Sequence, residues 1–129
     1  MQNNSPKSCY CSSGNSFSDC CEPYIKGIEN APTAEKLMRS RYCAYATQEA
    51  DYLVATTHIS TRKYHKKSDI LEWSKSNNWL RLEVLSASEN SVEFKAYFLD
   101  NQLQANIHHE KSAFKFENGK WFYVDGKFF

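Results

Sequence analysis

The sequence predicts an α+β domain in which N-terminal helices pack on one face of a bent antiparallel sheet of four to five strands. Apolar residues recur with a period of 3.6 between residues 33 and 78, and with a period of 2 from residue 79 onward. Turns rich in Ser, Asn and Asp separate the alternating runs. Helices followed by a meander of strands are typical of this class, and 129 residues are enough for one such domain.

Helices are expected in three stretches of the first half. Thr33 can cap the first helix, and Met38 and Tyr42 follow it at helical spacing. A second, short helix is expected at about 51–57, and a third over 68–78.

The second half of the chain predicts strands over 80–84, 92–98, 103–109, 114–117 and 120–124. The Asn-Gly pair at 118–119 joins the last two strands, because both residues accept the positive φ of a tight hairpin turn. In the third strand, the row expected to face the core is Leu103, Ala105, Ile107 and His109.

Composition excludes several classes of protein. The chain has only 4 Gly and 3 Pro, too few for a collagen-like or Pro-rich disordered protein. No apolar run approaches the ~20 residues that a membrane helix needs. The polar start, Met1–Ser5, predicts no secretion signal and therefore a cytoplasmic location. A net charge of +1 predicts no general attraction to membranes or nucleic acids.

Four of the five cysteines lie close together in the sequence, as Cys9, Cys11, Cys20 and Cys21. In a reducing compartment such a cluster is more often a metal site than a disulfide framework. Four thiolates close a tetrahedral Zn²⁺ shell and leave no position for water, which makes the site structural. The alternative is a set of free or oxidised thiols. The fifth cysteine, Cys43, is expected to be a small buried hydrophobic residue.

A metal would also explain how the first 24 residues become ordered, since they contain almost no aliphatic side chains. Structural Zn²⁺ supplies about 10–16 kcal/mol of apparent binding free energy in small domains. Lys7 and Lys26 flank the cluster and would offset the negative charge of zinc with four thiolates.

The spacing C-x-C-x-S-G-x5-C-C resembles the SEC-C motif, the zinc-binding tail motif of the SecA ATPase. The matching positions are Cys9, Cys11, Ser13, Gly14, Cys20 and Cys21. Tyr10, Ser12 and Asn15 stand where the motif usually has Pro, Gly and Lys, and none of these is a ligand.

Further segments are similar to the YchJ family, namely 31–42, 50–53, 57–62, 109–114 and 119–126. The resemblance implies a cone-shaped domain, cystatin-like or nuclear-transport-factor-2-like, over residues 31–129. A SEC-C-like zinc-binding segment and connector would precede it over residues 1–30. The family has no established activity, so the resemblance implies a fold and a structural Zn²⁺ but no reaction.

Two functions from different classes are compatible with these features. The favoured hypothesis is a non-enzymatic adaptor or binding module, whose SEC-C motif contacts a protein or ribosomal partner. The alternative is a protein that binds a small molecule, or an acid–base enzyme, and uses the pocket of the cone. Candidate pocket residues are Arg41, Tyr45, His58, Trp79, His109, Glu110 and Tyr123.

A histidine beside a carboxylate can act as an acid–base pair. His109 and Glu110 are adjacent on a strand, however, so they face opposite sides unless a bulge intervenes. The competing interpretation makes His109 a core histidine. Arg41 could bind an anionic ligand bidentately or brace the domain through a buried pair with Glu110, and the second is favoured.

One basic run, residues 62–67, contains an aromatic residue. This composition suits contact with phosphates, but it is more often that of a solvated loop. Nucleic-acid binding is therefore expected to be weak at most, through Arg62, Lys63, Lys66 and Lys67.

Overall fold

In the computed structural model, residues 8–129 are described, and within them four strands form one antiparallel sheet in the order β1-β2-β3-β4. Neighbours in the sheet are also neighbours in the chain, so the sheet is the predicted meander. The predicted class, α+β with a bent antiparallel sheet, is confirmed. Two sequence predictions concern residues outside the described range. These are the absence of a secretion signal at Met1–Ser5 and the offset of negative charge by Lys7. The strands are β1 Asn78–Ala87, β2 Ser91–Leu99, β3 Ala105–Glu117 and β4 Lys120–Phe128.

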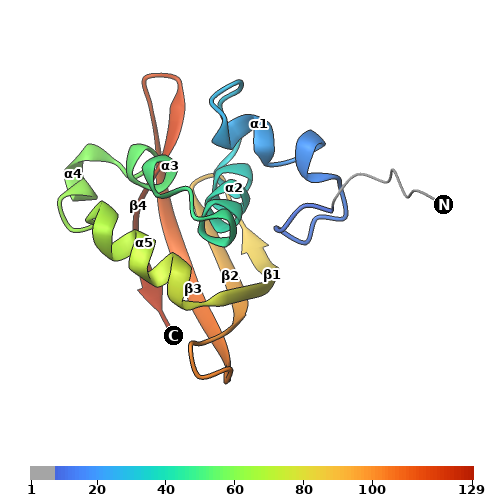
Figure 1. The fold of residues 1–129 in the computed structure, drawn as a ribbon. Coiled ribbons are helices and arrows are strands. Elements are labelled where there is room, and N and C mark those ends of the chain that lie inside the picture. The colour runs from blue at the N-terminus through green and yellow to red at the C-terminus, as the bar shows by residue number, and fades with distance from the viewer. Residues whose placement is uncertain (1–7) are drawn as a thin grey trace.

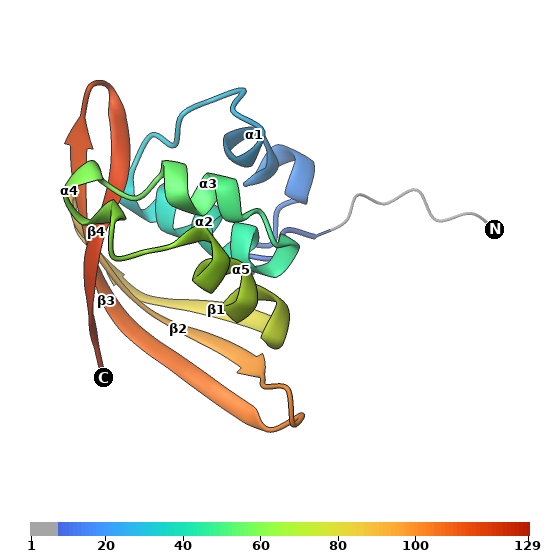
Figure 2. The ribbon, with the colours of Figure 1, turned by 60° about the vertical axis from the view of Figure 1, so that its left-hand side comes forward.

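The helices precede the sheet in the chain and lie on its concave side (Figures 1 and 2). Figure 2 shows the strands bending away beneath them, which leaves a tapering space between the two layers. Among the described residues, no helix has the length and apolar character that crossing a membrane requires. The helices are η1 Phe17–Asp19, α1 Glu22–Ile25, α2 Ala34–Thr47, α3 Ala50–Ala55, α4 Ile59–Arg62 and α5 Lys67–Ser76.

Helix α2 is the central element of the helical layer. Thr33 Oγ1 accepts a hydrogen bond from Lys36 N at 3.1 Å, so the predicted cap is present. Gln48, with a φ of 64°, ends the helix in the left-handed region. The buried face of α2 packs on β1, β2 and β4, and this contact positions the side chains discussed below.

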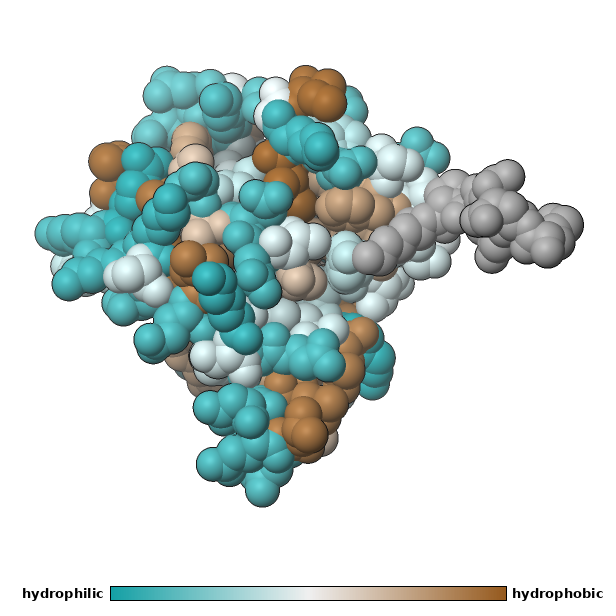
Figure 3. All heavy atoms as spheres, in the orientation of Figure 1, coloured by the Kyte–Doolittle hydropathy of each residue, from teal (hydrophilic) through white to brown (hydrophobic). Residues whose placement is uncertain are grey.

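The last two strands form the predicted hairpin, with Asn118 at φ 54° and Gly119 at φ 79°. The preceding strand differs from the prediction, because the opposite row of β3 faces the helices. Ile107 is 57 % exposed on the outer face, and Leu103 lies before the strand and is 77 % exposed. Figure 3 shows apolar surface near the lower end of the molecule, where β2 and β3 are joined. The inward row is His108, Glu110, Ser112 and Phe114.

The N-terminal segment packs directly against the helix and sheet layers. Its buried cysteines belong to the same cluster of buried side chains as Leu37 and Tyr42 of α2 and Val92 of β2. The segment predicted to depend on a metal therefore shares its core with the rest of the chain.

Candidate metal centre and binding cavity

Four buried sulfur atoms converge where the N-terminal segment meets α2. The Sγ atoms of Cys9, Cys11, Cys21 and Cys43 all lie within 4.8 Å of one another. The Cys9 and Cys43 Sγ atoms are 3.4 Å apart. Zn–S bonds of about 2.3 Å place the sulfurs of a tetrahedral site roughly 3.8 Å apart. The four cysteines are therefore positioned to hold a metal ion.

This set differs from the sequence prediction in one member. Cys43, assigned to the core, lies in the group, and Cys20 lies beside it. The Cys20 Sγ is 3.7 Å from Cys11 Sγ and 3.8 Å from Cys21 Sγ. The physical reason is the fold of the chain: Cys43 is fully buried on the face of α2 that receives the N-terminal segment. The spacing of the cysteines between residues 9 and 21 cannot predict that α2 brings Cys43 to them.

A tight loop brings the first cysteines together. Cys9 N donates to Asn15 O at 2.8 Å, and Gly14 supports the reversal with a φ of 90°. Two hydrogen bonds fasten this loop to the rest of the chain. Arg39 Nη1 donates to Cys11 O at 3.0 Å, and Leu82 N donates to Ser12 Oγ at 3.1 Å.

The thiols of the group differ in acidity. Hydrogen bonds from its sulfur neighbours, Cys21 first, lower the pKa of Cys11 well below its usual range. The hydrogen bond to Cys11 raises the pKa of Cys21. A Cys11 thiolate would carry a negative charge. Arg39, whose guanidinium donates to the Cys11 carbonyl, is a cation near that charge. Lys26 instead pairs with Glu22 at 3.8 Å, at the surface.

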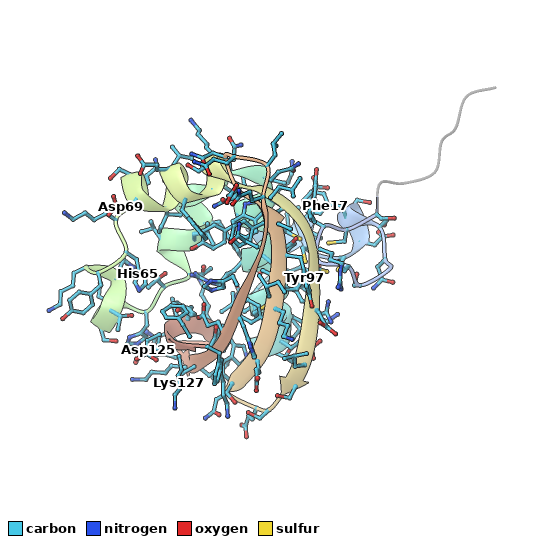
Figure 4. All side chains as sticks on the ribbon, turned by 90° about the horizontal axis from the view of Figure 1, so that it is seen from below. Phe17, His65, Asp69, Tyr97, Asp125 and Lys127 are labelled. Carbon is cyan, nitrogen blue, oxygen red and sulfur yellow. The ribbon has the colours of Figure 1, made fainter. Side chains whose placement is uncertain are left out.

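A second candidate site is a cavity of about 250 Å³ between α2, α5 and the concave face of the sheet. Figure 4 shows the loop that carries His65 lying across from β4, while the N-terminal segment with Phe17 is on the opposite side of the molecule. None of the five cysteines lines this cavity. Most of its wall is aromatic, with Tyr42, Trp73, Trp79, Phe94, Phe114 and Phe128.

Glu110 places a carboxylate in this cavity, although only 6 % of the residue is exposed. It accepts hydrogen bonds from His108 Nε2 at 2.7 Å, Ser112 Oγ at 2.7 Å and Tyr123 Oη at 2.9 Å. Burial would raise the pKa of Glu110, but these donors, His108 first, outweigh burial and lower it. The carboxylate is therefore charged at neutral pH.

Arg41 lines the same cavity from α2. Its guanidinium lies 4.5 Å above the centre of the Tyr123 ring. Its Nη1 donates to Leu53 O at 2.9 Å and to Thr56 Oγ1 at 2.7 Å. Among the ion pairs of the described residues none joins Arg41 to Glu110, so the expected direct brace is corrected. Tyr123 lies between them and contacts both.

Gly126 of β4 makes room for the carboxylate. A Cβ built at this position would lie 2.8 Å from Glu110 Cγ and would overlap the carboxyl group. A side chain at position 126 would therefore push the Glu110 carboxylate away from its present position.

Comparison with known proteins places the chain in a family. Residues 33–126 match the family model described as the middle, NTF2-like domain of YchJ. A UPF0225 protein from Photorhabdus laumondii is 41 % identical over 125 residues, which cover 92 % of this chain and 79 % of the relative. The chain belongs to the YchJ family.

Two solved structures resemble this YchJ-family chain over most of its length. A SEC-C motif containing protein from Rhodopseudomonas palustris superposes with a TM-score of 0.85 at 36 % identity, over 92 % of this chain and 96 % of that one. Another, from Psychrobacter arcticus, gives a TM-score of 0.74 at 30 % identity, over 91 % and 80 %. The NTF2-like fold and the SEC-C resemblance are therefore confirmed.

The YchJ-like domain brings five of the seven predicted pocket residues to the cavity, namely Arg41, Tyr45, Trp79, Glu110 and Tyr123. The other two need correction. His58 accepts a hydrogen bond from Ser60 N at the start of α4, and its Nε2 lies 2.9 Å from Glu117 Oε1. His109 faces outward.

The outward position of His109 follows from the register of β3. Its Nε2 lies 2.8 Å from Glu93 Oε2, and its ring packs 4.5 Å from the Phe129 ring. The partner of Glu110 is instead His108, which sequence reasoning missed. Residues two apart on a strand share a face, and that rule could have found His108.

The basic run is divided between three local environments. Arg62 Nε donates to Thr57 O at 3.0 Å, and Lys67 Nζ pairs with Asp51 at 2.8 Å. Tyr64 is 72 % exposed, whereas His65 turns inward and packs against the Tyr123 ring. The run thus contributes one residue to the cavity. The weak contact with nucleic acid stays a prediction.

Proposed function

We propose that this chain is a small-molecule-binding protein, in which a structural Zn²⁺ ties the N-terminal segment to the cone-shaped domain. The zinc part rests on the donor set, four buried thiols from two separate parts of the chain. Thiolates favour Zn²⁺ among the common divalent ions, and a closed shell of them leaves no position for a substrate. Such thiols stay reduced in a cytoplasm, which we propose as the location.

The observation that carries the binding function is the charged carboxylate of Glu110 in a cavity of about 250 Å³. A closed core would avoid a buried charge, because desolvation is costly even when hydrogen bonds compensate for it. Apolar walls with a few converging polar groups are typical of small-molecule sites. The alternative hypothesis from the sequence is thereby favoured over the adaptor hypothesis, and we assign no reaction to the site.

Filling the cavity tests this proposal. Ala96 is buried on β2 and lines the cavity, so Ala96→Phe is expected to occupy the space that a ligand needs. Fragments that bind the zinc-loaded protein in ligand-observed NMR should lose binding to this variant by at least about tenfold. Ala105→Phe, at an exposed position of β3, is the matched control and should bind as the wild type does. Equal binding to both variants would show that the fragments bind elsewhere.

An adaptor role is the second candidate, and one observation favours it. Ser12, Ser13, Gly14 and Asn15 are exposed although the neighbouring cysteines are buried, so a folded loop is presented to solvent. We propose a protein or ribosomal partner for this loop. The zinc-loaded protein should then co-sediment with purified ribosomes and stop doing so when Ser13 and Asn15 are both replaced by glutamate. Sedimentation that these changes leave unaltered would contradict the role of the loop.

A further inference from the structure

Polar atoms that line the cavity and have no hydrogen-bond partner among residues 8–129 indicate the chemistry of its ligand. The carboxylate of Glu110 already accepts hydrogen bonds from His108, Ser112 and Tyr123. Arg41, by contrast, donates through Nη1 alone. Within residues 8–129, its Nε and Nη2 have no hydrogen-bond partner. The Glu110 carboxylate therefore already has three donors, while two nitrogens of the Arg41 guanidinium are available to a ligand.

These nitrogens reach open space although Arg41 is only 8 % exposed. No buried side-chain nitrogen or oxygen in the described part of the chain lacks a partner. Unpartnered Nε and Nη2 atoms must therefore be accessible to solvent, and the space beside them is the cavity that Arg41 lines. An ordered guanidinium with two unpartnered nitrogens is a ready site for a planar acceptor.

A second donor lies next to Arg41. Tyr45 follows it by four residues on α2, so the two side chains share one face of the helix. Tyr45 also lines the cavity, and its hydroxyl has no hydrogen-bond partner within residues 8–129. Its ring packs 5.8 Å from that of Trp79, which places this donor at the edge of the aromatic wall.

The surroundings favour a small anion over a cation. Besides its histidines, the lining contains one basic and one acidic side chain, Arg41 and Glu110, and the three hydrogen bonds to Glu110 contrast with the open nitrogens of Arg41. A cationic ligand would have to compete with the three donors that already bind the oxygens of Glu110. The volume of about 250 Å³ is at the low end for ligand pockets, which are roughly 300–1,000 Å³, so one ring is the expected size.

We propose that the cavity binds a small carboxylate that carries one aromatic ring, with the carboxylate on Arg41 and Tyr45 and the ring against Trp79. Arginine binds carboxylates through parallel N–H···O bonds, and these are stronger than hydrogen bonds between neutral groups. This inference rests on the proposed ligand-binding function and names its ligand class.

Three probes of similar shape test the ligand class: phenylacetate, 2-phenylethanol and phenethylamine, each titrated into the zinc-loaded protein by NMR. A hydrogen-bonded charge contributes about 1.5–3 kcal/mol, so phenylacetate is expected to bind at least about tenfold more tightly than the other two. Any other ranking, including no binding by all three, overturns the ligand class. The binding function is then judged by the fragment experiment with Ala96→Phe, so the two proposals fail separately.

Variants locate the carboxylate. Tyr45→Phe removes one hydroxyl without changing the ring, and should weaken phenylacetate binding about 2- to 10-fold. Tyr64→Phe is the matched control at an exposed tyrosine and should leave binding unchanged. Arg41→Gln should abolish the preference for the acid over the alcohol. Because Arg41 is buried, that variant is first checked for folding by circular dichroism. Unchanged phenylacetate affinity in Tyr45→Phe, or an unchanged preference for the acid in folded Arg41→Gln, overturns the proposed placement.

Discussion

Replacing Cys43 by serine is expected to abolish the proposed metal binding and to destabilise the protein by several kcal/mol. The reason is that Cys43 supplies one of the four converging sulfur atoms and is the one that belongs to the central helix α2. Structural zinc contributes about 10–16 kcal/mol of apparent binding free energy in small domains, and an incomplete ligand set forfeits much of it. The measurement is zinc per chain after purification under reducing conditions.

Cys20→Ser is the matched control, because Cys20 is a neighbouring thiol outside the converging group. It should keep about one zinc per chain. A chelator should lower the melting temperature of the wild type and of Cys20→Ser, and should have no further effect on Cys43→Ser. Loss of zinc from Cys20→Ser with retention in Cys43→Ser would instead support the ligand set expected from the motif alone.

Replacing Glu110 by glutamine is expected to destabilise the protein by about 1–3 kcal/mol at pH 7, because the amide cannot accept all the hydrogen bonds of the carboxylate. The effect should depend on pH. The folded-state pKa of Glu110 lies below its ordinary value of 4.5, so ionisation of this group stabilises the folded state above that value. This contribution is lost as the pH falls through the folded-state pKa.

Urea unfolding of both proteins between pH 7 and pH 3 checks this prediction. The difference in unfolding free energy between wild type and Glu110→Gln should shrink below about pH 4.5. Glu117 and Asp100 also have lowered pKa values, but both proteins contain them, so their contributions cancel in the difference. A difference that stays constant over this range would contradict the buried, charged state of Glu110.

Local signals predicted most of the fold. The Thr33 cap, the helical spacing that follows it and the Asn-Gly hairpin at 118–119 each depend on residues close in sequence, and each is present in the structure. The alternating row of β2 also faces inward as predicted, with Val92, Ala96 and Phe98 buried. The family resemblance then supplied the curved arrangement of the sheet, which periodicity alone does not determine.

The features that were missed depend on contacts between distant parts of the chain. Apolar residues of β3 predicted which face of the strand is buried. The row that faces inward is instead mostly polar, and it lines the cavity. The sequence suggested His109 as the histidine beside Glu110. In the structure that histidine is His108, because residues two apart on a strand share a face. Cys43 is buried in the core as expected, and only the packing of the N-terminal segment on α2 brings it to the other thiols.

We propose that a ligand binds inside the cone, between α2 and the sheet. The most direct test is to locate a bound fragment by nuclear Overhauser effects on the zinc-loaded protein. We expect contacts between the fragment and the side chains of Trp79 and Tyr123, which both line the cavity, and none with Tyr97 on the outer face of β2. Contacts confined to the outer face, or a cavity that no fragment enters, would contradict it.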